Sequence, residues 1–131
     1  MTISILFIVG RIIFGLYWLR QAYNHLFHSA GMIGYAQSKG VPQPKLAVLG
    51  TGVLIAIGGL SILSGMWITI GLSAIAIFLV GVTFTMHAYW KDTDPMSKMG
   101  NEINFWKNLA LLGAVLMMFA FSGSWGVVGQ K

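Results

Sequence analysis

The stretch Leu46–Trp90 contains no Lys, Arg, Asp or Glu. A transmembrane helix needs about 20 consecutive apolar residues, so this stretch is long enough for two helices that cross a membrane. Ser64 and Gly65 interrupt its aliphatic pattern near the middle, and a small hydroxyl residue followed by glycine is typical of a turn. The stretch therefore predicts a membrane hairpin, with helices over 46–64 and 67–89.

The composition excludes a water-soluble domain. Of the 131 residues, 56% are hydrophobic and 8% are charged, and such a chain would expose too much apolar surface in water. At this length we expect a single transmembrane domain, residues 1–131. The net charge of +5 comes from Lys and Arg residues spread singly along the chain, which indicates lipid headgroup contacts rather than a nucleic-acid surface. The chain has no cysteine, so disulfides and thiolate chemistry are excluded.

Two further apolar segments flank the hairpin and predict helices over 3–23 and 105–121. Together with the hairpin they predict an all-α fold, an up-down transmembrane bundle of four helices. Arg11 lies inside the first segment, where a charged side chain costs about 2.5–3.5 kcal/mol on insertion scales. We expect Arg11 to face other helices and to make a buried polar contact. The alternative is that its side chain extends to the membrane surface.

The first connection, residues 24–45, contains Pro42 and Pro44 after a glycine. Two prolines at this spacing cannot continue a helix, and we expect them to hold the backbone extended before the next span. A short interfacial or re-entrant helix is predicted around residues 32–36, with Tyr35 at the depth of the lipid headgroups.

The second connection, residues 91–104, carries all three acidic residues of the chain. Asp94-Pro95 and Gly100-Asn101 are turn signals. We therefore expect an ordered but mostly non-helical loop at the membrane surface.

The distribution of cations predicts the orientation. Four crossings place both termini on one side of the membrane and the two longer connections on the other. Most cations lie on the connection side, namely Arg20, Lys39, Lys45, Lys91, Lys98 and Lys107. By the positive-inside rule we expect a multi-pass protein of a prokaryotic plasma membrane, with cytoplasmic connections and both termini outside.

Polar side chains that suit ligand binding occur near the connection-side ends of the predicted helices. They are His25, His28, His87, Glu102 and Asn108. Imidazole and carboxylate groups could bind a metal, ligate a haem iron or hydrogen-bond to quinone carbonyls; the alternative is ordinary hydrated polarity at the interface. His87 follows Thr83 at helical spacing and needs a partner such as Asn108, Glu102 or a ligand.

Short motifs occur in a fixed order along nearly the whole chain: Gly10-Arg11, Gly40-Val41-Pro42-Gln43-Pro44, Gly58-Gly59, His87-Ala88-Tyr89-Trp90 and Phe105-Trp106-Lys107-Asn108-Leu109-Ala110-Leu111-Leu112-Gly113. In this order they resemble the DoxX family of small four-helix membrane proteins. The resemblance implies association with membrane oxidoreductases, since the family takes its name from small subunits of archaeal terminal oxidase and thiosulfate:quinone oxidoreductase systems. Many relatives carry an acid shortly before the paired glycines, where this chain has Ile55 and Ala56. A proton or cation role of that acid therefore does not carry over.

Three functional hypotheses follow. In the first, the protein is a non-catalytic small subunit or accessory component of a quinone-linked membrane oxidoreductase, and a quinone or haem comes from a partner. In the second, it transports a small solute or ion, with Arg11 attracting an anion. In the third, it is a self-associating scaffold whose protomers pack through Gly50, Gly52, Gly58, Gly59 and Gly71. A stand-alone enzyme has the least support, because no activated nucleophile, phosphate-binding loop or close acid pair occurs, and no catalytic residue is assigned.

Overall fold

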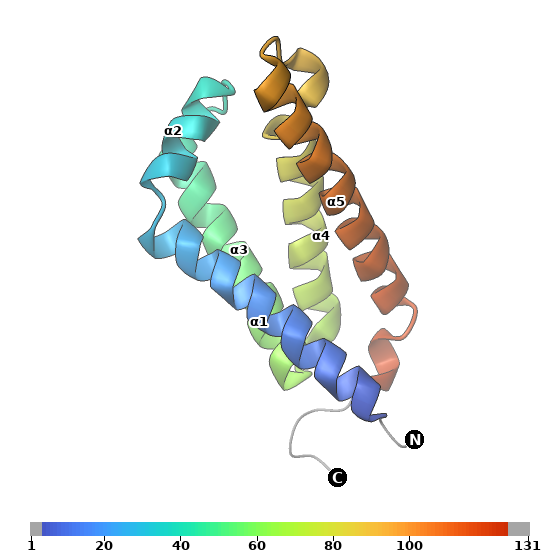
Figure 1. Cartoon of the computed structure of the whole chain (residues 1–131). Helices are drawn as coiled ribbons and strands as arrows, with labels where there is room; N and C mark the ends of the chain where they lie inside the picture. Colours follow the sequence, from blue (N-terminus) through green and yellow to red (C-terminus); the bar gives the residue numbers. More distant parts are fainter. Residues whose placement is uncertain (1–3, 126–131) are drawn as a thin grey trace.

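The computed structural model describes residues 4–125, and all regular structure in that range is helical. The elements, in chain order, are α1 Ile5–Phe27, α2 Ala30–Ser38, α3 Pro44–Ser64, α4 Ile68–Thr85, η1 Tyr89–Lys91, α5 Pro95–Phe119 and η2 Ser122–Ser124. The all-α prediction is confirmed for this part of the chain. Among the long helices, α1 packs against α3, α3 against α4 and α4 against α5 (Figure 1).

Within residues 4–125, three segments are long and apolar enough to cross a membrane, namely Ile5–Phe27, Pro44–Ser64 and Ile68–Lys91. The third combines α4 with η1. α5 does not join them, since polar residues such as Glu102 and Lys107 lower the hydropathy of its first half. The fourth crossing at residues 105–121, and with it the four-helix transmembrane bundle, therefore stays a prediction.

The turn between α3 and α4 is confirmed at the predicted place. α3 ends at Ser64, and Gly65 adopts a left-handed backbone with φ of 79°. The hydroxyl of Ser61 lies 2.6 Å from the carbonyl oxygen of Met66 and 3.0 Å from that of Trp67, so it can donate to the turn. A hydroxyl near the end of α3 thereby holds the carbonyl groups of the turn that leads into α4.

Gly58 and Gly59 lie where neighbouring helices of the same chain approach closely. A Cβ atom on Gly58 would lie 2.4 Å from Ile75 of α4, and one on Gly59 would lie 2.9 Å from Leu19 of α1. On α4, a Cβ atom on Gly71 would lie 2.3 Å from Ser61. These glycines bring α1, α3 and α4 of one chain together, which leaves them little surface for contact between protomers.

The first connection contains the predicted short helix, which is α2. The prediction of an extended backbone before the second span is wrong at one position: Gln43 is left-handed, with φ of 50°. Pro44 then occupies the first turn of α3, where its fixed φ and missing N–H are tolerated. The chain thus changes direction at Gln43 and enters α3 at the next residue.

The prediction of a mostly non-helical second connection is wrong, because α5 begins at Pro95. The side chain of Asp94 accepts a hydrogen bond from the backbone N–H of Ser97 at 2.9 Å and caps the helix. An N-cap aspartate followed by proline starts a helix as well as it marks a turn. By contrast, α4 ends at Thr85, earlier than the predicted residue 89, and the Met86 carbonyl lies 3.1 Å from the hydroxyl of Tyr35.

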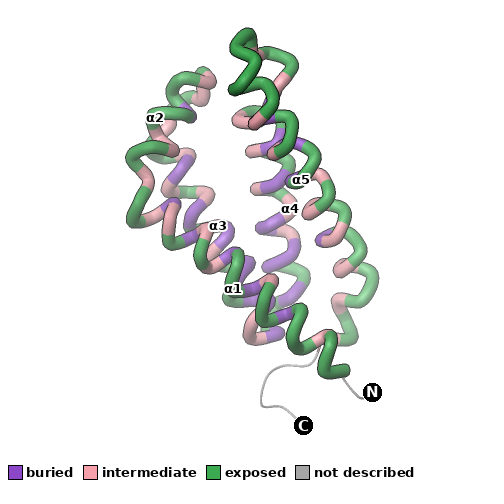
Figure 2. The backbone as a smooth tube through the Cα atoms, in the orientation of Figure 1, coloured by how far each residue is buried: buried purple, intermediate pink, exposed green. Residues whose placement is uncertain are grey.

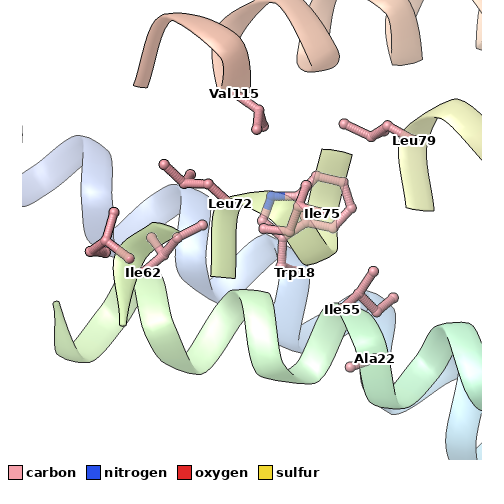
Figure 3. Close-up of a cluster of buried hydrophobic side chains, with 9 residues drawn as sticks. Trp18, Ala22, Ile55, Ile62, Leu72, Ile75, Leu79 and Val115 are labelled. Atoms are coloured by element: carbon pink, nitrogen blue, oxygen red, sulfur yellow. The ribbon is translucent and has the colours of Figure 1, made fainter. Parts of the chain in front are cut away.

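The buried core lies where α1, α3, α4 and α5 face one another (Figures 2 and 3). Trp18 is 1% exposed and occupies the middle of this cluster. It is surrounded by aliphatic side chains, including Ile55, Ile62, Leu72, Ile75, Leu79 and Val115. The outer faces of the helices expose large apolar side chains, as expected for helices in contact with lipid.

Candidate functional site

A cavity of about 590 Å³ lies between the helices at the end of the molecule that carries α2. Its walls come from α1, α2 and α3 on one side and from α4 and α5 on the other, and these two groups diverge toward that end (Figure 1). The lining is mainly apolar and includes Trp18, Leu54, Ile77 and Phe78. The polar residues that line it are Tyr17, Gln21, His25, Tyr35, Thr51, Thr85, His87, Asn104, Lys107 and Asn108.

His25 lies on the α1 wall and is buried. Its Nδ1 atom lies 3.2 Å from the carbonyl oxygen of Val48 and 3.1 Å from the hydroxyl of Thr51, both on α3. This contact depends on Gly52, since a Cβ atom there would lie 2.8 Å from the Cβ of His25. The ring of Phe78 packs against the imidazole edge to face, with centroids 5.6 Å apart. Neighbouring residues thus fix the orientation of the imidazole.

His87 lies just after α4, on the opposite side of the cavity. Its Nδ1 atom lies 3.1 Å from the side-chain oxygen of Asn101 on α5. The sequence suggested Asn108, Glu102 or a ligand as the partner of His87, and the partner that Nδ1 has in the structure is Asn101. This difference follows from the early start of α5, which turns the Gly100-Asn101 pair from a loop into part of a helix.

A polar network spans the cavity end from α2 to α5. The amide nitrogen of Asn101 lies 2.7 Å from a carboxylate oxygen of Asp92 and 2.7 Å from the hydroxyl of Tyr35. The second carboxylate oxygen of Asp92 accepts a hydrogen bond from the ammonium group of Lys39. The network therefore ties α2 to the segment after α4 and to α5 through side chains of all three segments.

The charges of this network stabilise each other. The hydrogen bond from Asn101 and the ion pair with Lys39 lower the pKa of Asp92 below its ordinary value. The same ion pair raises the pKa of Lys39 above its ordinary value. Both groups consequently stay charged across the physiological pH range.

The structure brings together three of the five polar residues singled out from the sequence. His25, His87 and Asn108 line the cavity. His28 is exposed, with its Nε2 atom 3.4 Å from the hydroxyl of Tyr23, and Glu102 is exposed on α5; neither lines the cavity. Within residues 4–125, no group of three or more His, Asp or Glu side chains is placed to hold a metal ion.

Arg11 lies away from the cavity, near the other end of the molecule, and is 7% exposed. Its Nε atom donates to the carbonyl oxygen of Ile62 at 2.6 Å, and an Nη atom donates to that of Leu63 at 3.3 Å. The guanidinium also lies 5.6 Å from the ring centre of Trp125. These carbonyls belong to the last turn of α3, so Arg11 satisfies acceptors that the helix end leaves open.

Sequence reasoning missed Asn101, although a signal was present. Asn101, Asn108 and Val115 recur at intervals of seven and are all buried, so they share the inward face of α5. Extending the helix back to an Asp94 cap would have placed Asn101 on that face. The pairing of Lys39 with Asp92 had no comparable signal, because the two residues lie far apart in sequence.

The fold and the cavity define a small helical membrane protein. The protein-family model DoxX matches residues 6–88, and the chain belongs to the DoxX family. The chain is similar to the inner membrane protein YphA of Escherichia coli (strain K12), with 30% identity over 116 residues that cover 87% of this chain and 81% of that protein. No solved structure matches the chain.

Proposed function

We propose that the protein binds a lipid-soluble molecule of the quinone class in the cavity and acts as a non-catalytic accessory component of a membrane oxidoreductase. The cavity is the observation that carries this proposal. Its volume of about 590 Å³ lies within the range of about 300–1,000 Å³ that is typical of ligand pockets. A mainly apolar wall with a few converging polar groups suits a molecule that has an apolar tail and a polar ring.

The polar side chains of the cavity fit such a ring. A quinone presents two carbonyl oxygens, which accept hydrogen bonds. Gln21 on α1, and Lys107 and Asn108 on α5, supply amide and ammonium donors from the two sides of the cavity. A ring placed between α1 and α5 would therefore find donors toward both carbonyls.

An accessory role suits the chemistry of this lining better than a catalytic one. The described residues around the cavity supply no carboxylate or thiol. The Thr51 hydroxyl lies 2.8 Å and 2.9 Å from the carbonyl oxygens of Ala47 and Val48, so its proton is already held by the backbone. Electron transfer would then depend on a quinone or haem provided by partner subunits.

Quinone binding can be tested on the purified full chain in nanodiscs with decylubiquinone, a short-tailed quinone. We expect saturable quenching of tryptophan fluorescence, since Trp18 lines the cavity. Replacing Asn108 with leucine should weaken binding about fivefold through the loss of one hydrogen bond, whereas His28→Phe, outside the cavity, should leave the affinity unchanged. Equal affinities of native and Asn108→Leu protein would argue against binding at this site.

The role in an oxidoreductase needs a separate test. A tagged chain, purified gently from native membranes, should bring a dehydrogenase or oxidase with it. Recovery of the chain with lipids alone, at native expression levels, would contradict the accessory role without affecting the binding result.

We further propose that the protein spans a prokaryotic plasma membrane several times, with both termini outside and the cavity end in the cytoplasm. The name of the E. coli relative, an inner membrane protein, supports this location. Because the chain has no cysteine, single cysteines at Gln37 on α2 and at the exposed Met66 in the turn between α3 and α4 give an unambiguous test with a membrane-impermeant thiol reagent. Labelling of Gln37→Cys from outside intact cells would overturn this orientation.

The structure favours neither alternative function. Arg11 is engaged with α3 and lies away from the cavity, so it is poorly placed to attract an anion into it. The glycines of the scaffold hypothesis pack mainly against helices of the same chain. Gly52, Gly58, Gly59 and Gly71 have close neighbours in the same chain, whereas a Cβ atom on Gly50 would meet nothing within 4 Å.

A further inference from the structure

We propose that the cavity prefers the reduced, hydroquinone form of its ligand over the oxidised quinone. This inference rests on the proposed function, because it names the form of the same ligand that the same cavity selects. The inference depends on the hydrogen bonds of His25 and His87. The direction of these bonds determines whether each ring has a donor or an acceptor left for a ligand.

The proton of His25 can be assigned from its neighbours. Its Nδ1 atom lies 3.2 Å from the carbonyl oxygen of Val48, which can only accept a hydrogen bond. The hydroxyl of Thr51, 3.1 Å away, directs its own proton to a backbone carbonyl and so presents a lone pair to the ring. The Nδ1 atom of His25 therefore carries the proton.

The proton of His87 follows from the orientation of Asn101. The carboxylate of Asp92 can only accept, so the side-chain atom of Asn101 that lies 2.7 Å from it is the amide nitrogen. The side-chain oxygen of Asn101 then faces His87, at 3.1 Å from Nδ1. This oxygen accepts, and the Nδ1 atom of His87 donates.

In both rings the Nε2 atom remains for a ligand. The residues described provide no hydrogen-bond partner for either Nε2 atom, and neither atom is sealed from contact, unlike the indole nitrogen of Trp18. The described residues that line the cavity include no carboxylate to stabilise an imidazolium, and Lys107 is a cation. A neutral imidazole that donates through Nδ1 accepts through Nε2. His25 and His87 thus present two acceptors to the cavity.

Two acceptors discriminate between the redox forms of a quinone. The carbonyl oxygens of the oxidised form only accept hydrogen bonds. A carbonyl oxygen beside Nε2 would therefore place two acceptors side by side, with no proton between them. The hydroxyl groups of the reduced form donate to Nε2, and their oxygens still accept from the amide of Asn108 or the ammonium of Lys107. Sites built around hydrogen bonds reject analogues that lack the required proton, because polar groups are then left unpaired.

The experiment compares three probes on the full chain in nanodiscs under anaerobic conditions: decylubiquinone, its hydroquinone, and the di-O-methyl ether of the hydroquinone. We expect the hydroquinone to bind at least about tenfold more tightly than the other two, as two added hydrogen bonds of about 1 kcal/mol each would give. The ether keeps the ring and the tail and lacks only the hydroxyl protons, so it separates hydrogen bonding from shape.

Variants test whether the histidines cause the preference. In the double variant His25→Phe, His87→Phe, the ratio of the affinities for hydroquinone and quinone should fall to about one, while His28→Phe keeps the native ratio. Helical circular dichroism identifies a variant that fails to fold. Equal binding of hydroquinone and quinone by the native chain, or tighter binding of quinone, would overturn the inference and leave the proposed function intact. Failure of all three probes to bind would overturn the proposed function and the inference with it.

Discussion

Close packing between α3 and α4 predicts that Gly58 tolerates no side chain. In Gly58→Ala, the added Cβ atom would lie 2.4 Å and 2.7 Å from two side-chain carbons of Ile75 and 3.2 Å from the carbonyl oxygen of Gly71. Ile75 is fully buried in the core cluster, so it can move only by displacing other core side chains. The helices must therefore separate, or the core must repack.

The magnitude follows from two opposing effects. Overpacking a close-packed core costs about 1–3 kcal/mol. Alanine is a better helix former than glycine by about 1 kcal/mol, which offsets part of that cost. Gly50 lies on the same helix with nothing within 4 Å of an added Cβ atom, so Gly50→Ala shows the helix effect alone. The difference in free energy of unfolding between the two variants should accordingly be about 1–3 kcal/mol.

The assay is equilibrium unfolding in mixed detergent micelles, followed by far-ultraviolet circular dichroism. Gly58→Ala should unfold at a lower fraction of denaturing detergent than the native chain, and Gly50→Ala at an equal or higher fraction. Equal unfolding curves for the two variants would show that α3 and α4 do not meet at Gly58, and would refute the packing argument.

Three further predictions concern the ends of the helices. Asp94→Ala should destabilise the start of α5 by about 0.5–2 kcal/mol, seen as faster hydrogen exchange at the amide of Ser97; unchanged exchange would exclude a capping role. Arg11→Met should lower the free energy of unfolding by about 1–3 kcal/mol, because the last carbonyls of α3 lose their donor; detergent unfolding measures this, and a variant as stable as the native chain would contradict it. The lowered pKa of Asp92 means that its contact with Lys39 is complete above about pH 4, the ordinary aspartate value, and is lost as the pH falls through the lowered value. The raised pKa of Lys39 means that the contact persists below about pH 10.4 and is lost as the pH rises through the raised value. The two ordinary values of about 4 and 10.4 bound a window that includes pH 5 to pH 9. A fluorophore on Gln37→Cys should therefore report a constant environment of α2 between about pH 5 and pH 9, and release of α2 from Asp92 at lower pH. A change near pH 6.5 would point to a histidine instead.

Local chemistry explains which parts of the fold could be predicted. The turn at Gly65 and the close approach at Gly58 depend on the absence of a side chain, and glycine shows that directly in the sequence. The Asp94-Pro95 pair was misassigned because the same two residues suit a turn and a helix start, and only the contacts of the following residues decide between them. At Gly65 and Gly58 the local preference of the residue agrees with the tertiary packing. At Asp94-Pro95 the local preference allows two structures, and the tertiary contacts decide between them.

The candidate site could be predicted only in part, because its partners come from distant segments. The pattern of polar residues near helix ends grouped His25, His28, His87, Glu102 and Asn108 in one region. The cavity lining includes His25, His87 and Asn108 but not His28 or Glu102. The partner of His87 depends on the rotation of α5, and that of Lys39 on the path of α2 across the cavity end. Neither the rotation nor the path follows from residue spacing within one helix.

The position of Arg11 affects how a ligand could reach the cavity. Its hydrogen bonds join α1 to the end of α3 on the side of the molecule remote from α2, where the helices are held by direct contact with backbone carbonyls. At the other end, the hydrogen bonds that cross between the two groups of helices come from the side chains of Tyr35 and Lys39 on the α2 side. The turn at Gly65, which joins α3 to α4, lies at this same Arg11 end. We therefore expect a guest molecule to enter and leave by a movement of α1–α3 relative to α4–α5 about this turn, with α2 as the part that moves furthest.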